Sequence, residues 1–314
     1  MRFSLKLAVS LSIQSKLINF GMFYKATKEQ SRLRMALIGP SGSGKTMSAL
    51  AIAGHLGDRI AVIDTEHGSA SKYADQFVFD TCELQSFHPQ QYINAIVAAE
   101  NAGYDVLIID SLSHAWMGKD GALELVDRAA KRSQSNNTFT AWRDVTPLQN
   151  QLVEAMLGCK CHLIATIRAK TEYVMEKDEK GKTVPRKVGL APVQRNDLEY
   201  EFDICGDMDL ENNLIISKSR CPALAGQIIP RPGEQVALVL NQWLSTGVPA
   251  RPKINREAIV QETSQELLRL GWSQSDGKKH LETTYGKTSR QLLTDDELVD
   301  FLEYLRSSES ERVS

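Results

Sequence analysis

The stretch "RMALIGPSGSGKTMSAL", residues 34–50, decides the fold class of this chain. An apolar run ends at Gly39, and residues 39–46 then match the pattern G-x-x-x-x-G-K-[ST] at every position. Glycines let the backbone N–H groups of such a loop face phosphate oxygens, and the helix that follows directs its positive dipole end at them. The pattern predicts a phosphate-binding loop, the Walker A motif, made of Gly39, Pro40, Ser41, Gly42, Ser43, Gly44, Lys45 and Thr46.

Two side chains of this loop have specific chemical roles in the prediction. The Lys45 ammonium is expected to reach the β- and γ-phosphates of a nucleotide. The Thr46 hydroxyl is expected to ligate Mg²⁺. The alternative is a simple Gly/Ser turn before a helix, which the complete match and the strand–helix context disfavour.

Apolar runs alternate with helical patterns through the first 240 residues. Strands are predicted at 34–39, 59–64, 104–110 and 161–167, and helices at 45–57, 89–103, 121–135 and 144–158. Strands without polar alternation are buried on both faces, and the interspersed helices would cover them, which predicts an α/β fold with a mainly parallel sheet. Beyond Thr171 a hairpin turning at 179–181 and short strands at 201–209 and 213–219 predict an antiparallel extension.

The run "VLIID", residues 106–110, ends in an aspartate two strands away from the phosphate loop in the predicted order. Such an aspartate holds Mg²⁺ in Walker B strands, so Asp110 is the second predicted metal residue. Many P-loop ATPases place a glutamate directly after it to activate water, but here Ser111 follows. The catalytic carboxylate must therefore come from elsewhere or be absent.

The stretch "AVIDTEHGSASKY", residues 61–73, offers that carboxylate. Ligands gather at the carboxyl ends of the strands in such sheets, and Glu66 falls at the end of the strand 59–64. We expect Asp64 to bond neighbouring backbone and His67 to be a bystander. The alternative for Glu66 is a solvated loop carboxylate.

With these motifs in place, residues 34–230 resemble the RecA/Rad51-type recombinase ATPases. Their catalytic glutamate stands in a segment like "IDAEH", matched here by "IDTEH", and the segments "DVLIIDS" and "ATIRAKTEY" are similar to their next two strands. The resemblance implies that Glu66 activates water and that Tyr73, seven positions on, stacks on adenine. It also implies that Lys218 and Arg220 in "IISKSR" reach the γ-phosphate of a neighbouring subunit, and hence a homo-oligomer.

More closely, the chain resembles phage-encoded RecA-like ATPases proposed to act in single-strand annealing and recombination. It departs from true recombinases because the glycine-rich second DNA loop is missing, which puts strand exchange in doubt more than ATP binding. Simple packing of Tyr73, and an exposed strand face for Lys218 and Arg220, remain open alternatives.

A predicted hairpin stands in place of that loop. Its cations are Arg168, Lys170, Lys177, Lys180, Lys182, Arg186 and Lys187. With Tyr173 interleaved, they could contact the phosphates and a base of single-stranded DNA. Four acidic residues dilute the charge, so a merely solvated hairpin is the alternative.

The composition is that of a globular protein, with 314 residues, 42% hydrophobic and 24% charged. A net charge of -2 gives no overall attraction to nucleic acid, so such a site must be a local basic patch. Five cysteines without zinc-finger spacing indicate reduced thiols and a cytoplasmic location. No apolar run approaches the roughly 18 residues of a membrane span, and we expect no membrane partner.

The predicted domains are an N-terminal extension (1–30), a RecA-like ATPase domain (31–245), a linker (246–254) and a small helical module (255–314). Residues 1–21 only faintly imitate a secretion signal, and Met22 is an alternative initiator. In the helical module Thr294 and Glu297 have the spacing of a capping box.

The sequence thus predicts an ATP- and Mg²⁺-dependent ATPase that acts on single-stranded DNA in phage or prophage recombination. A single-strand binding or replication protein is a further expected partner. The alternative is an ATP-switched regulator or loader that recruits a replication protein without DNA-stimulated turnover. A small-molecule kinase ranks below both, because no acceptor pocket or lid is evident.

Overall fold

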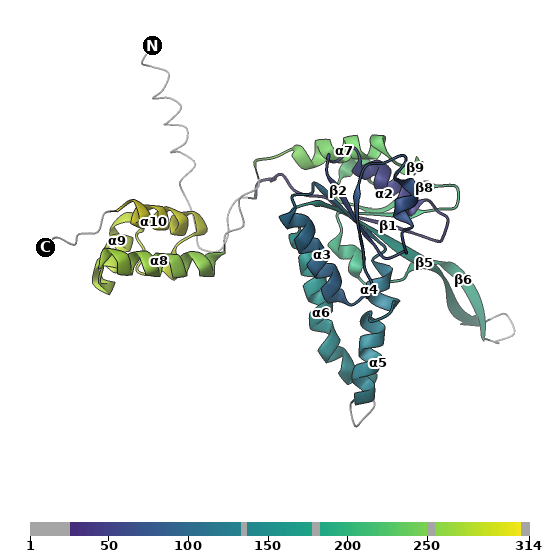
Figure 1. Ribbon diagram of the computed structural model, residues 1–314, viewed down its shortest axis with the longest axis horizontal. Coiled ribbons are helices and arrows are strands. Elements are labelled where there is room, and N and C mark those ends of the chain that lie inside the picture. Colours follow the sequence, from purple (N-terminus) through teal and green to yellow (C-terminus); the bar gives the residue numbers. More distant parts are fainter. Residues whose placement is uncertain (1–25, 133–136, 178–182, 250–254, 309–314) are drawn as a thin grey trace, which may run out of the picture. The chain divides into compact units, whose positions relative to one another are not determined.

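The computed structural model of the chain describes residues 26–132, 137–177, 183–249 and 255–308, and for residues 171–190 the backbone alone. The chain divides between Pro249 and Ala250 into two compact units (Figure 1). The predictions for residues 1–21 and for Met22, Lys180 and Lys182 lie outside the described residues. So do those for the side chains of Tyr173, Lys177, Arg186 and Lys187.

In the larger unit, the described residues form one nine-stranded sheet. The strands are β1 (Arg34–Gly39), β2 (Ile60–Asp64), β3 (Asp80–Glu83), β4 (Val106–Asp110), β5 (His162–Lys177), β6 (Thr183–Pro192), β7 (Ile204–Met208), β8 (Asn213–Ser219) and β9 (Ile228–Pro230). Their order is β3-β2-β4-β5-β1-β7-β8-β9, and β6 pairs with β5. The strands from β3 to β7 in this order run parallel, whereas the β5–β6, β7–β8 and β8–β9 pairs are antiparallel. The predicted α/β fold with a mainly parallel sheet is therefore confirmed.

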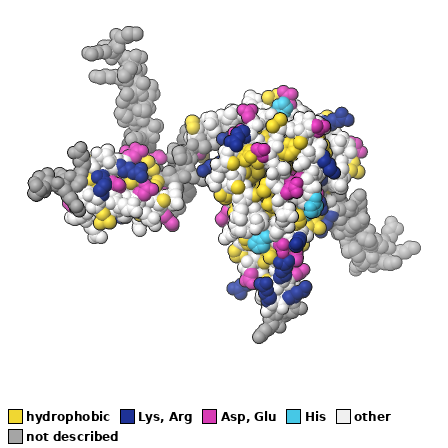
Figure 2. Space-filling view, in the orientation of Figure 1, with side chains coloured by type: hydrophobic (Ala, Val, Ile, Leu, Met, Phe, Trp, Pro, Cys, Tyr) yellow, Lys and Arg dark blue, Asp and Glu magenta, His cyan; other side chains and the backbone are white. Residues whose placement is uncertain are grey.

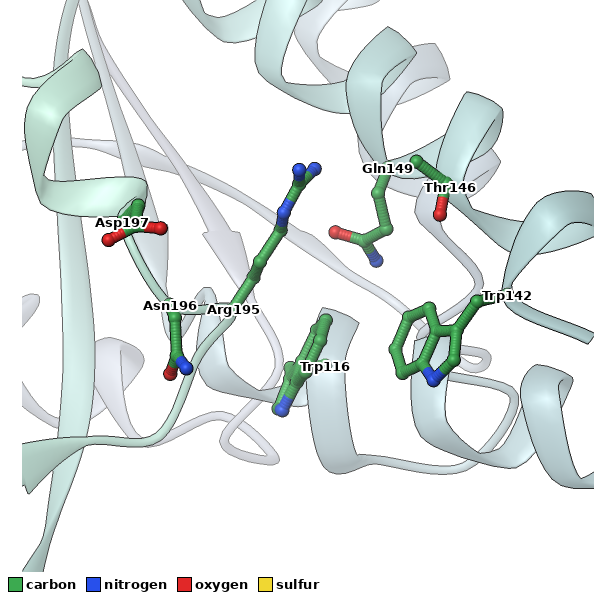
Figure 3. A pocket seen from close by; sticks show the side chains of 7 residues that line it. All are labelled: Trp116, Trp142, Thr146, Gln149, Arg195, Asn196 and Asp197. Atoms are coloured by element: carbon green, nitrogen blue, oxygen red, sulfur yellow. The ribbon is translucent and has the colours of Figure 1, made fainter. Parts of the chain in front are cut away.

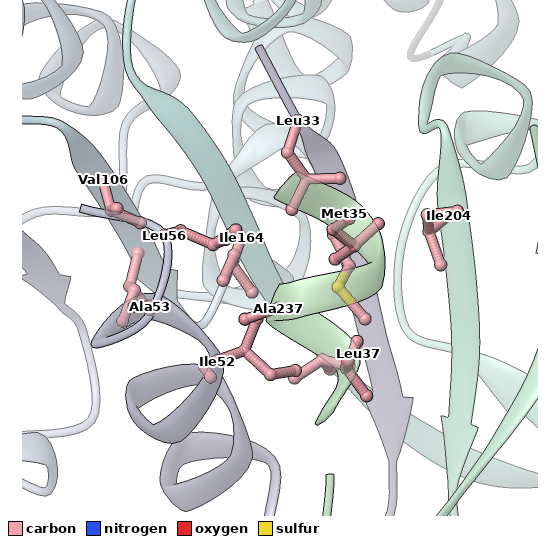
Figure 4. Packing of buried hydrophobic residues seen from close by; sticks show 14 of the residues in the cluster. Leu33, Met35, Leu37, Ile52, Ala53, Leu56, Val106, Ile164, Ile204 and Ala237 are labelled. Carbon is pink, nitrogen blue, oxygen red and sulfur yellow. The ribbon is translucent and has the colours of Figure 1, made fainter. Parts of the chain in front are cut away.

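Helices cover both faces of this sheet (Figure 1). They are α2 (Lys45–Ala53), α3 (Pro89–Asn101), α4 (Ser113–Met117), α5 (Ala122–Arg132), α6 (Thr138–Gly158) and α7 (Glu234–Ser245). On one face, Ile52 and Ala53 of α2 and Ala237 of α7 pack with β1 in a buried cluster (Figure 4). On the other face, α3, α4 and α6 pack against β4 and β5, with α5 lying on α6. Burial on both faces explains why the central strands read as unbroken apolar runs.

The parallel register brings chemically distinct residues to one edge of the sheet. Asp64 pairs with Asp110 across β2 and β4, and Gly39 ends β1 beside Arg168 of β5. These strands run in the same direction, so the phosphate loop and the segments after β2 and β4 meet at the carboxyl edge of the sheet.

Several element boundaries differ from the prediction. The helix predicted at 45–57 ends at Ala53, because the chain turns at Gly54 and passes Asp105, whose carboxylate accepts bonds from the amides of Asp58 and Arg59. The helix predicted at 144–158 begins at Thr138, where the Asn137 side chain caps the amide of Phe139. The short strands β3 and β9 were not predicted, because neither carries a buried apolar run.

The smaller unit has its own core. It contains α8 (Arg256–Leu270), α9 (Gln274–Tyr285) and α10 (Asp295–Ser307). Leu298, Phe301 and Leu305 of α10 are buried against α8 and α9. The predicted capping box is confirmed, since Thr294 accepts from the Glu297 amide while the Glu297 carboxylate accepts from the Thr294 amide.

Within the described residues, no helix is both long and apolar enough to span a membrane.

Candidate nucleotide site

The phosphate loop joins β1 to α2. Gly44 stands at the helix N-cap with φ 80°, a left-handed conformation that glycine adopts without strain, and its cap carries no side-chain bond from the described residues. The first N–H groups of α2 are therefore free of a side-chain cap, as an anion site requires. At Gly39 a Cβ atom would lie 2.7 Å from the Met208 carbonyl oxygen, so only glycine fits beside β7.

Lys45 opens α2 at the edge of this loop. Its ammonium donates to the Pro40 carbonyl oxygen over 2.7 Å, folding the side chain back over the loop. Burial lowers the pKa of Lys45, while the charges of Asp110 and Glu66 act in the opposite direction. The ammonium therefore sits in the same electrostatic cluster as both predicted acidic residues.

Thr46 and Asp110 form the predicted metal pair. The Thr46 hydroxyl donates to Asp110 Oδ2 over 2.8 Å, and the Thr166 hydroxyl donates to Asp110 Oδ1. Burial raises the pKa of the Asp110 carboxyl, and the two hydroxyl bonds lower it in part. A hydroxyl and a carboxylate in contact beside the loop are the oxygen ligands that Mg²⁺ takes, so these residues fit the ion.

Glu66 follows β2 at the same edge. Both of its carboxylate oxygens accept from Arg168 at the end of the in-sheet part of β5, with 2.8 Å from Arg168 Nε to Glu66 Oε1. Burial raises the pKa of Glu66, but the bonds and charge of Arg168 outweigh burial and hold the pKa below its usual value. Glu66 is thus held by Arg168 at the carboxyl edge of the sheet, where its charge acts to raise the pKa of both Lys45 and Asp110.

The backbone after β2 is fixed by buried polar groups. Asp64 accepts from the amides of Glu66 over 2.6 Å and Ala70 over 3.2 Å, so the expected backbone role of Asp64 is confirmed. The Thr65 hydroxyl lies 2.7 Å from Nδ1 of His114, which stacks on Phe87. These contacts define where Glu66 can point.

Arg168, Thr65 and His114 are site residues that the sequence did not identify. Arg168 was counted among the hairpin cations, and no local signal ties it to Glu66, which is 102 positions away. Thr166 interrupts the apolar run 163–167, which was a signal in the sequence, and the structure shows its side chain to be fully buried.

Three further predicted site residues, Tyr73, Lys218 and Arg220, make contacts outside the phosphate loop. Tyr73 ends the short helix η2 (Ala70–Tyr73) and is half-buried against the cluster that contains α2. Lys218 donates to the Tyr200 carbonyl oxygen over 2.7 Å, and Arg220 pairs with Asp203 over 2.9 Å.

Asp203 also accepts from the amide of Arg34, where β1 begins. A strand rises about 3.3 Å per residue, so Arg34 and Gly39 lie roughly 16 Å apart. Lys218 and Arg220 are thus near the amino edge of the sheet, remote from the phosphate loop of their own chain. The predicted contact with a γ-phosphate requires a second copy.

The antiparallel β5–β6 hairpin extends from the carboxyl edge (Figure 1). Of its predicted cations, Arg168 is bound to Glu66 and Lys170 is exposed.

Comparison with known proteins agrees with this geometry. A family model described as an AAA domain matches residues 31–242, more than half of the chain. The uncharacterized protein slr1353 of Synechocystis sp. is 46% identical over 61 residues, which cover 19% of this chain and 21% of that protein. The chain therefore matches only about a fifth of the length of this relative.

Proposed function

Because the chain belongs to the AAA domain family, which supports ATP binding and hydrolysis, we propose that it is a Mg²⁺-dependent ATPase acting on single-stranded DNA in phage or prophage recombination or annealing. The loop residues 39–46 would hold the triphosphate through backbone N–H groups and Lys45. Thr46 and Asp110 would hold Mg²⁺, which supplies positive charge against the phosphate oxygens. Tyr73 would contact adenine.

Glu66 is proposed to orient the attacking water and to accept its proton at a carboxylate oxygen. A general base must be ionised and within reach of the nucleophile, and the low pKa of Glu66 keeps it ionised near neutral pH. Its pairing with Arg168 occupies both carboxylate oxygens, so the base is restrained until Arg168 moves.

The single observation that supports a DNA-linked ATPase is the position of Arg168. The same residue binds Glu66 and leads into the β5–β6 hairpin, the element proposed to contact single-stranded DNA. A strand bound to the hairpin would compete for Arg168 and free Glu66. Hydrolysis would then depend on DNA.

The test compares steady-state ATP turnover, with and without single-stranded DNA, for wild type, Glu66→Gln and Arg168→Gln. Glu66→Gln is expected to lower turnover about 10²- to 10⁴-fold with ATP affinity retained, since it removes only the base. Arg168→Gln is expected to turn over ATP without DNA stimulation. Glu83→Gln is the matched control, because Glu83 is an exposed carboxylate ending the neighbouring strand β3. Unchanged turnover in Glu66→Gln would refute the assigned base.

The second candidate is an ATP-switched regulator or loader that recruits a single-strand binding or replication protein. The separate helical unit after Pro249, with its own core, favours it as a docking module. Wild-type turnover that DNA does not stimulate, together with ATP-dependent binding to a helicase or primase, would select this candidate.

We further propose that the protein works as a cytoplasmic homo-oligomer in which Lys218 and Arg220 serve a neighbour's site. Mixing Glu66→Gln subunits with Lys218→Ala/Arg220→Ala subunits should restore part of the turnover that each lacks alone. If such mixtures assemble but recover no activity, Lys218 and Arg220 do not act on a neighbour's nucleotide. Their role would then be structural, through their hydrogen bonds to the 199–203 segment.

A further inference from the structure

A cavity of about 310 Å³ lies between α4, α6 and the segment after β6, apart from the phosphate loop. Its lining includes Trp116, Trp142, Gln149, Arg195, Asn196 and Asp197 (Figure 3). From its unpaired buried amide and its aromatic and guanidinium surfaces, we infer that this cavity binds a nucleobase. α4 and α6 pack on the face of the sheet opposite α2, so we take this base to be distinct from the adenine of an ATP held at the phosphate loop.

Gln149 carries the first part of the argument. Its side chain is 5% exposed, and its Nε2 has no hydrogen-bond partner in the described part of the chain. Figure 3 shows the amide directed between Arg195 and the two indole rings. A buried donor without a partner costs stability, so a ligand that brings an acceptor into the cavity gains a bond the free protein lacks.

The two tryptophans supply a stacking surface. Their ring centroids are 5.4 Å apart and their planes differ by 24°. A ring inserted between them would have to stack on both indoles, and a centroid separation of 5.4 Å leaves no room for it. A base stacks instead on the free side of the pair, toward the cavity, where both indoles are half-buried.

Arg195 and its neighbours supply the edge of the site. The Arg195 guanidinium donates to Asn150 Oδ1 over 2.9 Å, which holds this planar group beside the cavity. Asn196 and Asp197 add amide and carboxylate groups that are exposed at the rim. Amide donors and acceptors beside a stacked ring are the combination that reads the edge of an unpaired base.

Cations on α5 and α6 suit a strand more than a free nucleoside. The last turn of α5 carries Lys131 and Arg132, and the neighbouring α6 carries the exposed Arg143. In Figure 2, Lys and Arg side chains, with Asp and Glu side chains among them, lie over the end of the larger unit where α5 and α6 meet. These groups would neutralise phosphates beside the bound base. This part of the inference rests on the proposed action on single-stranded DNA, whereas binding of a base as such does not.

The test uses intrinsic fluorescence of full-length protein carrying Trp243→Phe and Trp272→Phe, which leaves Trp116 and Trp142 as the only tryptophans of the chain. Nucleosides and short homopolymeric single-stranded DNAs are titrated separately, without ATP. Stacking on the pair is expected to quench the emission in a saturable way.

Gln149→Leu on the same background is the decisive variant. It replaces the amide with an apolar side chain that is smaller by one heavy atom and removes the unpaired donor, so folding stability should stay close to that of the unmutated background. Affinity for the base should fall about tenfold, the value of one buried hydrogen bond. Trp142→Ala, with its melting temperature recorded, should remove most of the quenching.

Four results are distinguishable. Nucleoside or DNA binding that weakens in Gln149→Leu supports the pocket. If nucleosides quench the tryptophan emission but no DNA binds, the base pocket is supported and the proposed action on single-stranded DNA is refuted. DNA binding that is equal in wild type, Gln149→Leu and Trp142→Ala overturns the pocket and leaves the DNA function standing. Absence of quenching and of DNA binding overturns both.

Discussion

At the scale of single residues, charge placement separates the roles of two acidic side chains. Asp110 is buried with two hydroxyl donors, so the pKa of its carboxyl is raised by burial, whereas Arg168 holds the pKa of Glu66 low. A buried carboxylate with a raised pKa suits a metal ligand, because a bound cation would stabilise its charge. A carboxylate that stays ionised beside a guanidinium suits a general base.

The raised pKa of Asp110 predicts a pH-dependent effect of Asp110→Asn on stability. The folded protein takes up this proton more readily than the unfolded chain, so ionisation of Asp110 lowers stability as pH rises through the folded pKa. The nucleotide-free variant should therefore melt at a higher temperature than wild type at neutral pH, and the gain should vanish toward about pH 3.9.

Thermal melts across pH, with and without Mg²⁺ and ATP, check this effect. The variant should also lose most of the stabilisation that Mg²⁺ and ATP give the wild type. A lower melting temperature at neutral pH would show that burial does not dominate at Asp110.

At the scale of elements, the contact between the phosphate loop and β7 limits what the loop sequence can be. Gly39 ends β1 where the Met208 carbonyl oxygen and the Ser43 hydroxyl both lie within 2.7 Å of a would-be Cβ atom. To make room for a Cβ atom at position 39, either the Met208 backbone or the phosphate loop would have to move. Movement of the Met208 backbone would disturb the sheet, and movement of the loop would disturb the start of α2.

Gly39→Ala is therefore expected to destabilise the larger unit by about 1–3 kcal/mol and to weaken ATP binding. Chemical denaturation and ATP titration measure the two effects. Gly158→Ala at the end of α6 is the control, since a Cβ there meets nothing within 4 Å and should leave stability unchanged or slightly higher. Equal behaviour of the two variants would contradict the tight approach of β7.

At the scale of the whole molecule, two units with separate cores share one chain. Leu50, Ile52 and their neighbours form the core of the larger unit, and Phe301 is fully buried in the smaller one. The nucleotide site lies entirely in the larger unit, so ligand stabilisation should act there alone.

Phe301→Ala should lower the stability of the smaller unit by about 3–5 kcal/mol and leave the transition of the larger unit in place. Calorimetry with and without ATP can separate the two transitions, and ATP should raise only the melting temperature of the larger unit. Phe202→Ala, at a fully buried site of the larger unit, is the matched control with the opposite pattern. A single transition shifted by both substitutions would mean that the units unfold together.

The sequence by itself determined the phosphate loop, the mainly parallel sheet and the helical module. Each of these features depends on residues close together in the sequence. The loop follows from glycines and Lys45 at fixed spacing, the sheet from unbroken apolar runs, and a helix start in the module from the capping pair Thr294 and Glu297. It also located Asp110 and Glu66 at the carboxyl ends of their strands, because parallel strands share one edge.

Only the tertiary structure decided which side chains meet at that edge. Arg168 reaches Glu66 across 102 residues, and Lys218 with Arg220 lie at the other edge because β8 runs antiparallel to β1. The cavity beside Trp116, Trp142 and Gln149 joins helices and a loop far apart in sequence. Such contacts depend on strand order and packing, which local spacing does not encode.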